Sequence, residues 1–169
     1  MQRVVLVRHN SYLFKGTVEE NLKMAKPDAT KEEMEAVLQK VNLLGFLQTQ
    51  DGLQTQLLEK ASNLSGGQCQ RLVIARALLR TDSAVYIFDE AASNIDVESE
   101  ELIMNVIHEL AKTKTVLLIS HRLANVVKSD KIYFLKDGEI KESGKHDELM
   151  SRNGAYRHLY ESQMALENY

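Results

Sequence analysis

Leu64-Ser65-Gly66-Gly67-Gln68 is the stretch that decides the fold of this chain, because a long helical pattern begins directly after it and runs to Arg80. Ser65 and Gln68 have the spacing of a capping box, in which each side chain bonds the other residue's backbone N–H. The two glycines allow a tight turn into the helix. A helix start of this kind presents free N–H groups and the positive end of the helix dipole, so it can receive a phosphate. Taken alone, the five residues describe a well-capped helix equally well.

Length and composition describe an ordinary globular chain. It has 169 residues, of which 44% are hydrophobic and 27% charged, with a net charge of −3. This length is enough for one domain with a buried core. The mild acidity gives no general attraction to nucleic acid, so no nucleic-acid partner is expected. The single cysteine, Cys69, excludes an internal disulfide, and no apolar run approaches the ~20 residues that span a bilayer.

Three short apolar runs have the character of buried strands: residues 4–7, 84–88 and 115–119. The residues from about 15 to 81 form a mostly helical block between the first and second runs. An amphipathic helical pattern separates the second run from the third. This order predicts an α/β fold with a parallel sheet covered by helices on both faces. Asp137-Gly138, between two further strand-like segments, predicts a hairpin.

Polar residues follow two of these strands where each strand ends. Asp89 and Glu90 come after the second run, and His121 comes shortly after the third. In open parallel sheets the reacting groups lie beyond the carboxyl ends of the strands. An aspartate there can hold Mg²⁺ in a phosphate-transfer site, and a glutamate can take a proton from water or orient it. Each residue alone also fits an ordinary loop or helix cap, and this holds for Asp96 as well.

The order of these motifs resembles the nucleotide-binding domain of ABC transporters. Residues 64–68 match the signature motif letter for letter, residues 85–90 match Walker B, residues 93–96 resemble the D-loop, and His121 matches the switch histidine. The stretches 13–22 and 138–149 resemble exporter-type members. The resemblance covers essentially the whole chain. It implies a P-loop NTPase fold of the ABC ATPase type, with a helical signature subdomain at 15–81 and an α/β core at 1–14 and 82–169.

The resemblance also implies the cofactors, ATP and Mg²⁺, and a role for each motif residue. Glu90 and His121 would be catalytic, and Asp89 would hold Mg²⁺. The nucleotide-binding residues would be Ser65, Gly66, Gly67, Gln68 and Asp96. In the family two such domains dimerise head to tail, so that the signature of one domain meets ATP held by the Walker A motif of the other.

Three departures from the family pattern bear on activity. The sequence contains no G-x-x-x-x-G-K-[ST] Walker A motif, so we expect an incomplete domain that begins late and hydrolyses negligible ATP alone. His9 stands where the family has the Q-loop glutamine, which contacts Mg²⁺. Imidazole prefers softer ions, so a metal role for His9 is doubtful. Before the signature, the family's Gly-Glu-x-Gly is replaced by residues 58–61, which keep Glu59 and lose both glycines.

The expected partners are a second ABC nucleotide-binding domain and the transmembrane domain of a transporter, at the cytoplasmic face of the cell membrane. The chain would be the C-terminal portion of an exporter ATPase that couples ATP hydrolysis to transport. Alternatively, it would be a non-catalytic cassette that lends its signature to a partner ATPase. A DNA-repair or chromosome-structure ATPase head is a remote alternative, because the chain has no long coiled coil. Missing early strands would leave apolar surface and a sheet edge exposed and favour self-association.

Overall fold

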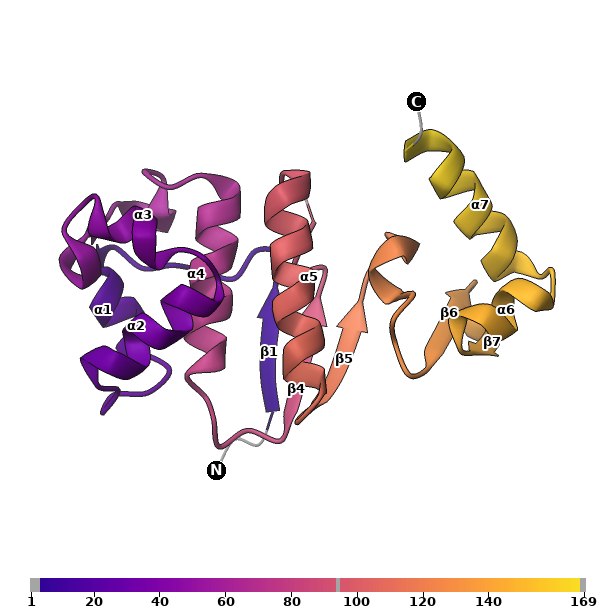
Figure 1. Cartoon of the computed structure of the whole chain (residues 1–169), viewed down its shortest axis with the longest axis horizontal. Helices are drawn as coiled ribbons and strands as arrows, with labels where there is room; N and C mark the ends of the chain where they lie inside the picture. The colour runs from indigo at the N-terminus through magenta and orange to yellow at the C-terminus, as the bar shows by residue number, and fades with distance from the viewer. Residues whose placement is uncertain (1–3, 94, 168–169) are drawn as a thin grey trace. The chain divides into compact units, whose positions relative to one another are not determined.

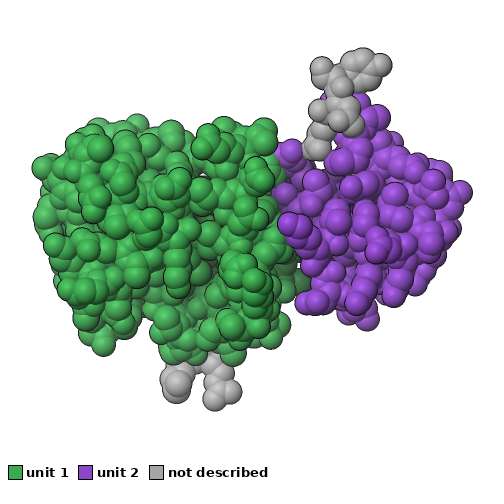
Figure 2. Space-filling view, viewed as in Figure 1, with its two compact units in different colours: residues 1–119 green, residues 120–169 purple. Residues whose placement is uncertain are grey.

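The computed structural model describes residues 4–93 and 95–167. The chain divides into two compact units, Met1–Ile119 and Ser120–Tyr169, which Figure 2 shows in different colours. Each unit is described by itself below. Asn94, part of the D-loop resemblance, lies outside the described residues.

The first unit is built on a three-stranded parallel sheet. Its strands are β1 (Val4–Arg8), β4 (Val85–Asp89) and β5 (Thr115–Ile119), in the order β1-β4-β5 (Figure 1). The register aligns Val7 with Phe88 and Phe88 with Leu118. The helix α5 (Val97–Ala111) connects β4 to β5, which confirms the predicted β-α-β order.

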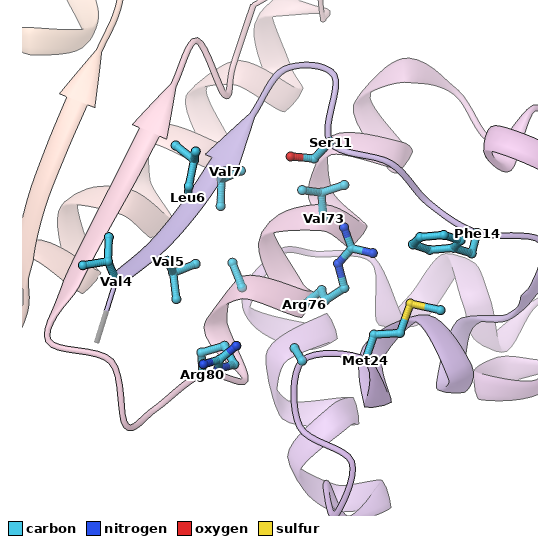
Figure 3. Close-up of a pocket in the computed structure, with 12 residues that line it drawn as sticks. Val4, Val5, Leu6, Val7, Ser11, Phe14, Met24, Val73, Arg76 and Arg80 are labelled. Atoms are coloured by element: carbon cyan, nitrogen blue, oxygen red, sulfur yellow. The ribbon is translucent and has the colours of Figure 1, made fainter. Parts of the chain in front are cut away.

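The two faces of this sheet differ in burial. One face packs on the helices α4 (Gly66–Leu78) and α5, and its Tyr86 and Phe88 are almost fully buried. The other face leaves four apolar side chains 45–49% exposed, namely Val4, Leu6, Leu117 and Ile119. Figure 3 shows the alternation along β1, where Val5 and Val7 point toward α4 and Val4 and Leu6 point away from it. Within the described residues, the apolar strands are therefore covered on one face only.

A helical block lies between β1 and β4. Its helices are α1 (Val18–Lys23), α2 (Lys31–Lys40) and α3 (Leu44–Gln48), and two 3-10 turns cover Gly52–Gln54 and Glu59–Ala61. Two short antiparallel strands, β2 (Gly16–Thr17) and β3 (Gln56–Leu57), tie its two ends together. The block buries apolar side chains from each helix, and α2 packs against α4.

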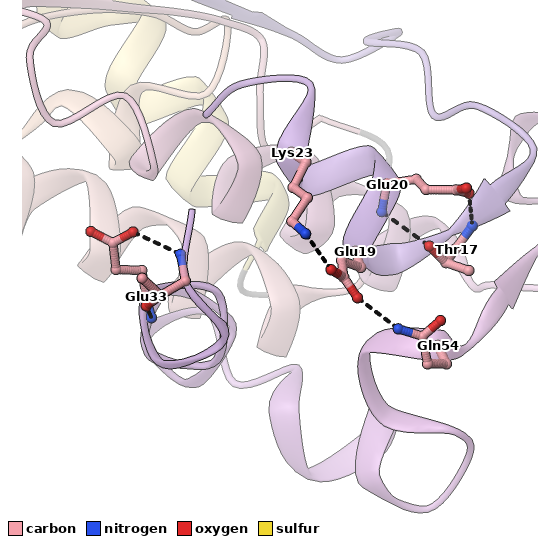
Figure 4. Close-up of polar contacts among 7 residues, drawn as sticks. Thr17, Glu19, Glu20, Lys23, Glu33 and Gln54 are labelled. Carbon is pink, nitrogen blue, oxygen red and sulfur yellow. Dashed lines mark hydrogen bonds and ion pairs between the residues drawn. The ribbon is translucent and has the colours of Figure 1, made fainter. Parts of the chain in front are cut away.

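Capping boxes begin both α1 and α2. The Glu20 amide donates to Thr17 Oγ1 at 3.0 Å, and the Thr17 amide donates to the Glu20 carboxylate at 2.7 Å (Figure 4). Thr30 and Glu33 repeat the arrangement at the start of α2. Each box satisfies N–H groups that have no acceptor inside the helix, so the local sequence alone sets where these helices begin.

The second unit contains a hairpin and two helices. Its elements are a 3-10 turn at Leu123–Val126, strands β6 (Ile132–Lys136) and β7 (Glu139–Gly144), and helices α6 (His146–Ser151) and α7 (Ala155–Glu167). The hairpin prediction is confirmed, since Asp137 and Gly138 both have positive φ, at 54° and 77°, as a type I′ turn requires. Tyr156 is fully buried and its hydroxyl lies 2.9 Å from His146 Nδ1.

Candidate functional site

The start of α4 has the geometry of an anion-binding helix terminus. Ser65 is the N-cap, and its Oγ accepts from the Gln68 amide at 3.2 Å. In return, Gln68 Oε1 accepts from the Ser65 amide at 2.9 Å, so the predicted capping box is complete. Ser65 and Gly66 are exposed. The Gly66 end of a 13-residue helix therefore opens to solvent beside a hydroxyl.

Gly67 brings this helix start against the start of α5. A Cβ placed on Gly67 would lie 2.5 Å from Ser99 Oγ and 3.0 Å from Asp96 Oδ2. Real Cβ atoms do not approach other atoms so closely, so a larger residue would push the two helix starts apart. The structure thus places Gly67 and Asp96, which are 29 positions apart in the sequence, in direct proximity.

Asp96 caps α5. Its Oδ1 accepts from the Ser99 amide at 2.8 Å. This backbone hydrogen bond is the main reason why the pKa of Asp96 lies below its ordinary value, and the Ser99 hydroxyl and the Arg71 charge lower the pKa further. Asp96 is therefore a carboxylate at neutral pH, and it places a negative charge close to the start of α4. Because this charge repels anions, an anion that binds at α4 would have to approach from the Ser65–Gly66 side.

The carboxyl ends of β1 and β4 bring three of the predicted residues together. The His9 amide donates to the Asp89 carbonyl at 3.2 Å, and the Asp89 carboxylate lies 3.8 Å from Arg8 Nε. The Glu90 amide donates to the Ile119 carbonyl at 3.0 Å, which anchors Glu90 to the end of β5. The Asp89 side chain is 40% exposed, so an ion can reach it.

These residues could supply only some of the ligands that a magnesium ion needs. Among residues 4–93 and 95–167, no three histidine, cysteine or acidic side chains gather as a metal-binding group. Mg²⁺ in phosphate-transfer sites is usually held by one or two carboxylates together with phosphate oxygens and water. An exposed carboxylate at a strand end meets that requirement. Asp89 stays the predicted ligand, and the His9 amide lies next to it through its hydrogen bond to the Asp89 carbonyl.

Glu90 has a backbone conformation that the sequence did not indicate. Its φ is +51°, in the left-handed region that costs an L-residue about 1–2 kcal/mol. Its carbonyl accepts from the Ser93 amide at 3.1 Å and from Ser93 Oγ at 2.9 Å, and these bonds hold the turn. Strained residues persist where the surrounding structure over-determines them, often at functional sites. The only sequence signal was an acidic residue directly after a buried strand.

The segment before the signature motif has a strained backbone where the family's two glycines are missing. Lys60 and Ala61 both have positive φ, at 57° and 52°. Ala61 stands where the family usually has glycine. Its positive φ is a backbone conformation that glycine adopts without strain and alanine does not. The Cys69 thiol packs beneath this turn, 3.6 Å from the Ala61 carbonyl oxygen.

His121 belongs to the second unit. Its carbonyl accepts from Gln163 Nε2 at 2.7 Å, and Gln163 Oε1 accepts from the Leu123 amide at 2.8 Å. Gln163 on α7 therefore fixes the loop that carries the candidate histidine, a role that sequence reasoning missed. No local motif marks it, because Gln163 lies about forty positions from the loop.

A groove lies beside β1, and its other walls are α4 and residues that flank α1, among them Phe14 and Met24 (Figure 3). Its volume is about 330 Å³, and it combines apolar side chains with two arginines, Arg76 and Arg80. None of the helices among the described residues has the length and hydropathy of a membrane span.

Comparisons with known proteins agree with this geometry. The family model described as ABC transporter matches residues 1–93, a range that contains the signature motif and Asp89. An uncharacterized ABC transporter ATP-binding protein of Haemophilus influenzae is 53% identical over 98% of this chain and 30% of its own length. An ATP-dependent lipid A-core flippase of Vibrio vulnificus is 42% identical over 94% of this chain and 27% of its own length.

A solved structure gives the same picture for the fold. A bacterial Atm1-family ABC exporter with ATP bound superposes with a TM-score of 0.87 at 30% identity, covering 95% of this chain and 28% of the exporter chain. This chain thus spans less than a third of the length of these proteins. With its motifs, its α/β sheet and these matches taken together, the chain belongs to the ABC transporter family.

Proposed function

We propose that this chain is the C-terminal portion of the ATP-binding domain of an exporter, and that it couples ATP binding and hydrolysis to transmembrane transport. The observation that carries the proposal is the meeting of two helix starts at Gly67, where no side chain fits between α4 and Asp96. This contact joins the signature motif to the D-loop. The matches to an exporter with ATP bound and to a flippase support the same reading.

Each predicted residue takes a role consistent with its surroundings. Ser65, Gly66 and Gln68 form the exposed side of a helix start that suits a phosphate. Asp89 would hold Mg²⁺, which supplies charge neutralisation for phosphoryl transfer when bound. Glu90, locked in its turn, would take a proton from water or orient that water. His121 would hydrogen-bond a phosphate.

The ATP site that we propose is shared between two chains. This sequence holds no Walker A loop, so the backbone cradle and lysine for the β- and γ-phosphates would come from elsewhere. The partner would be a second ABC nucleotide-binding domain that approaches the start of α4 head to tail. A transmembrane domain would complete the transporter, with this chain on the cytoplasmic side of the membrane. The substrate would be selected by that transmembrane domain.

ATP hydrolysis in a mixed assembly tests the proposal. The chain alone should release negligible phosphate from Mg-ATP. Added to an ABC nucleotide-binding domain that has a Walker A motif, it should raise the turnover per Walker A site. Ser65→Arg should abolish this stimulation because the bulky cation blocks the helix start. Ser162→Arg on exposed α7 is the matched control and should leave the stimulation unchanged. Robust turnover by the chain alone would contradict the proposal.

A non-catalytic cassette is the second candidate, favoured by a signature helix start whose capping box is complete within this chain. Such a cassette would only lend its signature to the partner's ATP. Glu90→Gln separates the two candidates, because it removes the base and leaves the start of α4 intact. If the chain contributes catalysis, the stimulation falls by about 10²-fold or more. If the chain acts by binding alone, the stimulation survives this change and is lost only with Ser65→Arg.

A further inference from the structure

The loop around His121 is held by two side chains. Ser120 lies within the loop, and its Oγ accepts from the Arg122 amide at 3.0 Å and donates to the Arg122 carbonyl at 3.1 Å. Gln163 reaches the loop from α7. Its Nε2 donates to the His121 carbonyl at 2.7 Å, and its Oε1 accepts from the Leu123 amide at 2.8 Å. A glutamine amide has both an acceptor and donors, so this one side chain bridges two backbone groups of the loop.

The bridge restricts the backbone next to the candidate histidine. The His121 carbonyl and the Leu123 amide belong to the two successive peptide groups on either side of Arg122. Peptide groups are planar, so a peptide plane that is held at its carbonyl restricts ψ of the residue before it. Leu123 is almost fully buried, which anchors the far end of the loop. A residue of α7 therefore helps to set the backbone from which the His121 side chain extends.

The helix α7 is anchored on the same face that carries Gln163. Tyr156, Tyr160 and Gln163 are spaced at i, i+4 and i+7, which places them on one side of a helix. Tyr156 is fully buried, and its amide donates to the Glu142 carboxylate at 2.9 Å. The Tyr160 ring lies 4.8 Å from the ring of His146. The hairpin and α6 therefore fix the position from which Gln163 reaches the loop.

We propose that Gln163 is a positioning residue for His121, and that ATP hydrolysis depends on the docking of α7 through this side chain. With α7 docked, the bridge holds the His121 loop in one conformation. If α7 moves away, the two bridged backbone groups lose their partner and the loop can rotate. The proposal rests on the proposed function, in which His121 would hydrogen-bond a phosphate. Gln163 itself acts only through the loop.

Turnover in the mixed assembly with a Walker A-containing domain tests the proposal. Gln163→Leu is close in size and removes both hydrogen bonds. A misplacement of ~1 Å can cost about 10²-fold in rate, so the stimulated turnover at saturating ATP should fall about ten-fold or more. The KM for ATP should stay unchanged, because the start of α4 is intact. If Gln163→Leu does not fold, Gln163→Glu takes its place, since it keeps the acceptor for the Leu123 amide and loses the N–H for the His121 carbonyl.

A double-mutant cycle separates positioning from a merely structural role. His121→Ala should lower the stimulated turnover at least as much as Gln163→Leu does. The double variant should show no further loss, because Gln163 acts through His121. Gly154→Ala is the control, since it weakens the start of the same helix without touching the loop. Its turnover should stay within two-fold of that of the unaltered chain.

NMR spectra of the full chain with labelled histidine give a readout that does not depend on ATP hydrolysis. The chain has five histidines, and His121→Ala identifies the signal of interest. Gln163→Leu should shift or broaden the His121 ring signal and leave those of His9 and His108, in the first unit, unchanged. Gly154→Ala should leave the His121 signal in place.

The outcomes distinguish this proposal from the proposed function. Stimulation that survives Gln163→Leu, losses that multiply in the double variant, an equal loss with Gly154→Ala, or an unmoved His121 signal would each overturn the positioning role alone. An unaltered chain that gives no stimulation would overturn the proposed function and this proposal together.

Discussion

Replacing Gly67 by alanine should destabilise the first unit, although alanine is the better helix former. The added Cβ would lie 2.5 Å from Ser99 Oγ and 3.0 Å from Ser99 Cβ, so the helix starts must separate. Overpacking of this kind costs ~1–3 kcal/mol. The gain in helix propensity offsets up to ~1 kcal/mol of that cost. We therefore expect a net loss of about 1 kcal/mol in the free energy of unfolding.

Gly45→Ala is the matched control for this change. Gly45 lies in α3, and nothing lies within 4 Å of the position of a Cβ there. Alanine at this position should raise the free energy of unfolding by up to ~1 kcal/mol. The changes in the two variants should therefore have opposite signs and differ by about 2 kcal/mol. Urea unfolding followed by far-UV circular dichroism measures both. Ser99→Ala removes the nearest atom and should restore part of the loss when combined with Gly67→Ala. If Gly67→Ala stabilises the chain as Gly45→Ala does, the reasoning about this contact is wrong.

Three further predictions follow from hydrogen bonds at helix starts. Ser65→Ala removes the cap of α4 and should cost about 1 kcal/mol in urea unfolding. The pKa of Asp96 is lowered by a backbone amide of α5, so its contribution to stability is present above pH ~4 and is lost as pH falls through the folded-state value. Asp96→Asn should therefore reduce the acid sensitivity of the unfolding midpoint. Gly154→Ala would place a Cβ 2.6 Å from the Glu142 carboxylate, displace it from the Tyr156 amide at the start of α7 and cost about 1 kcal/mol, as the loss of a helix cap does.

Each of these predictions has its own contradicting result. An unchanged midpoint for the Ser65 variant would mean that the capping box contributes nothing. An Asp96→Asn variant with the same pH profile as the unaltered chain would show that this carboxylate titrates normally in the fold. Hydrogen exchange in α7 that does not change in the Gly154 variant would show that the second unit accommodates the added methyl group.

Helix starts in this chain are predictable from the sequence because they are local. Thr17, Thr30 and Ser65 each bond a residue three positions on, so the pattern of side chains determines the structure. The order of the strands was also predictable, since buried apolar runs alternate with helical patterns. The hairpin at Asp137-Gly138 followed from the turn residues alone.

Features that depend on distant contacts were not predictable from the pattern. The approach of Gly67 to Ser99 requires α4 and α5 to pack side by side, which no local signal specifies. The left-handed conformation of Glu90 is imposed by its bonds to Ile119 and Ser93. Gln163 supports the loop of His121 from a helix about forty positions away.

The uncovered sheet face was predicted only in part from the sequence. Apolar runs in β1 and β5 predicted strands buried on both faces, yet Leu6 and Leu117 are 48% and 49% exposed. The expectation of exposed apolar surface is confirmed for the described residues. Self-association remains a prediction, which light scattering over a range of chain concentrations would measure.

ATP-dependent association tests the central claim, that the start of α4 is half of an ATP site, most directly. The chain is mixed with an ABC nucleotide-binding domain that holds a Walker A motif but cannot hydrolyse ATP, and the complex is measured by analytical ultracentrifugation. We predict a complex with Mg-ATP that is absent without nucleotide, lost with Ser65→Arg and retained with Ser162→Arg. A complex that forms equally without ATP, or that survives Ser65→Arg, would contradict the account.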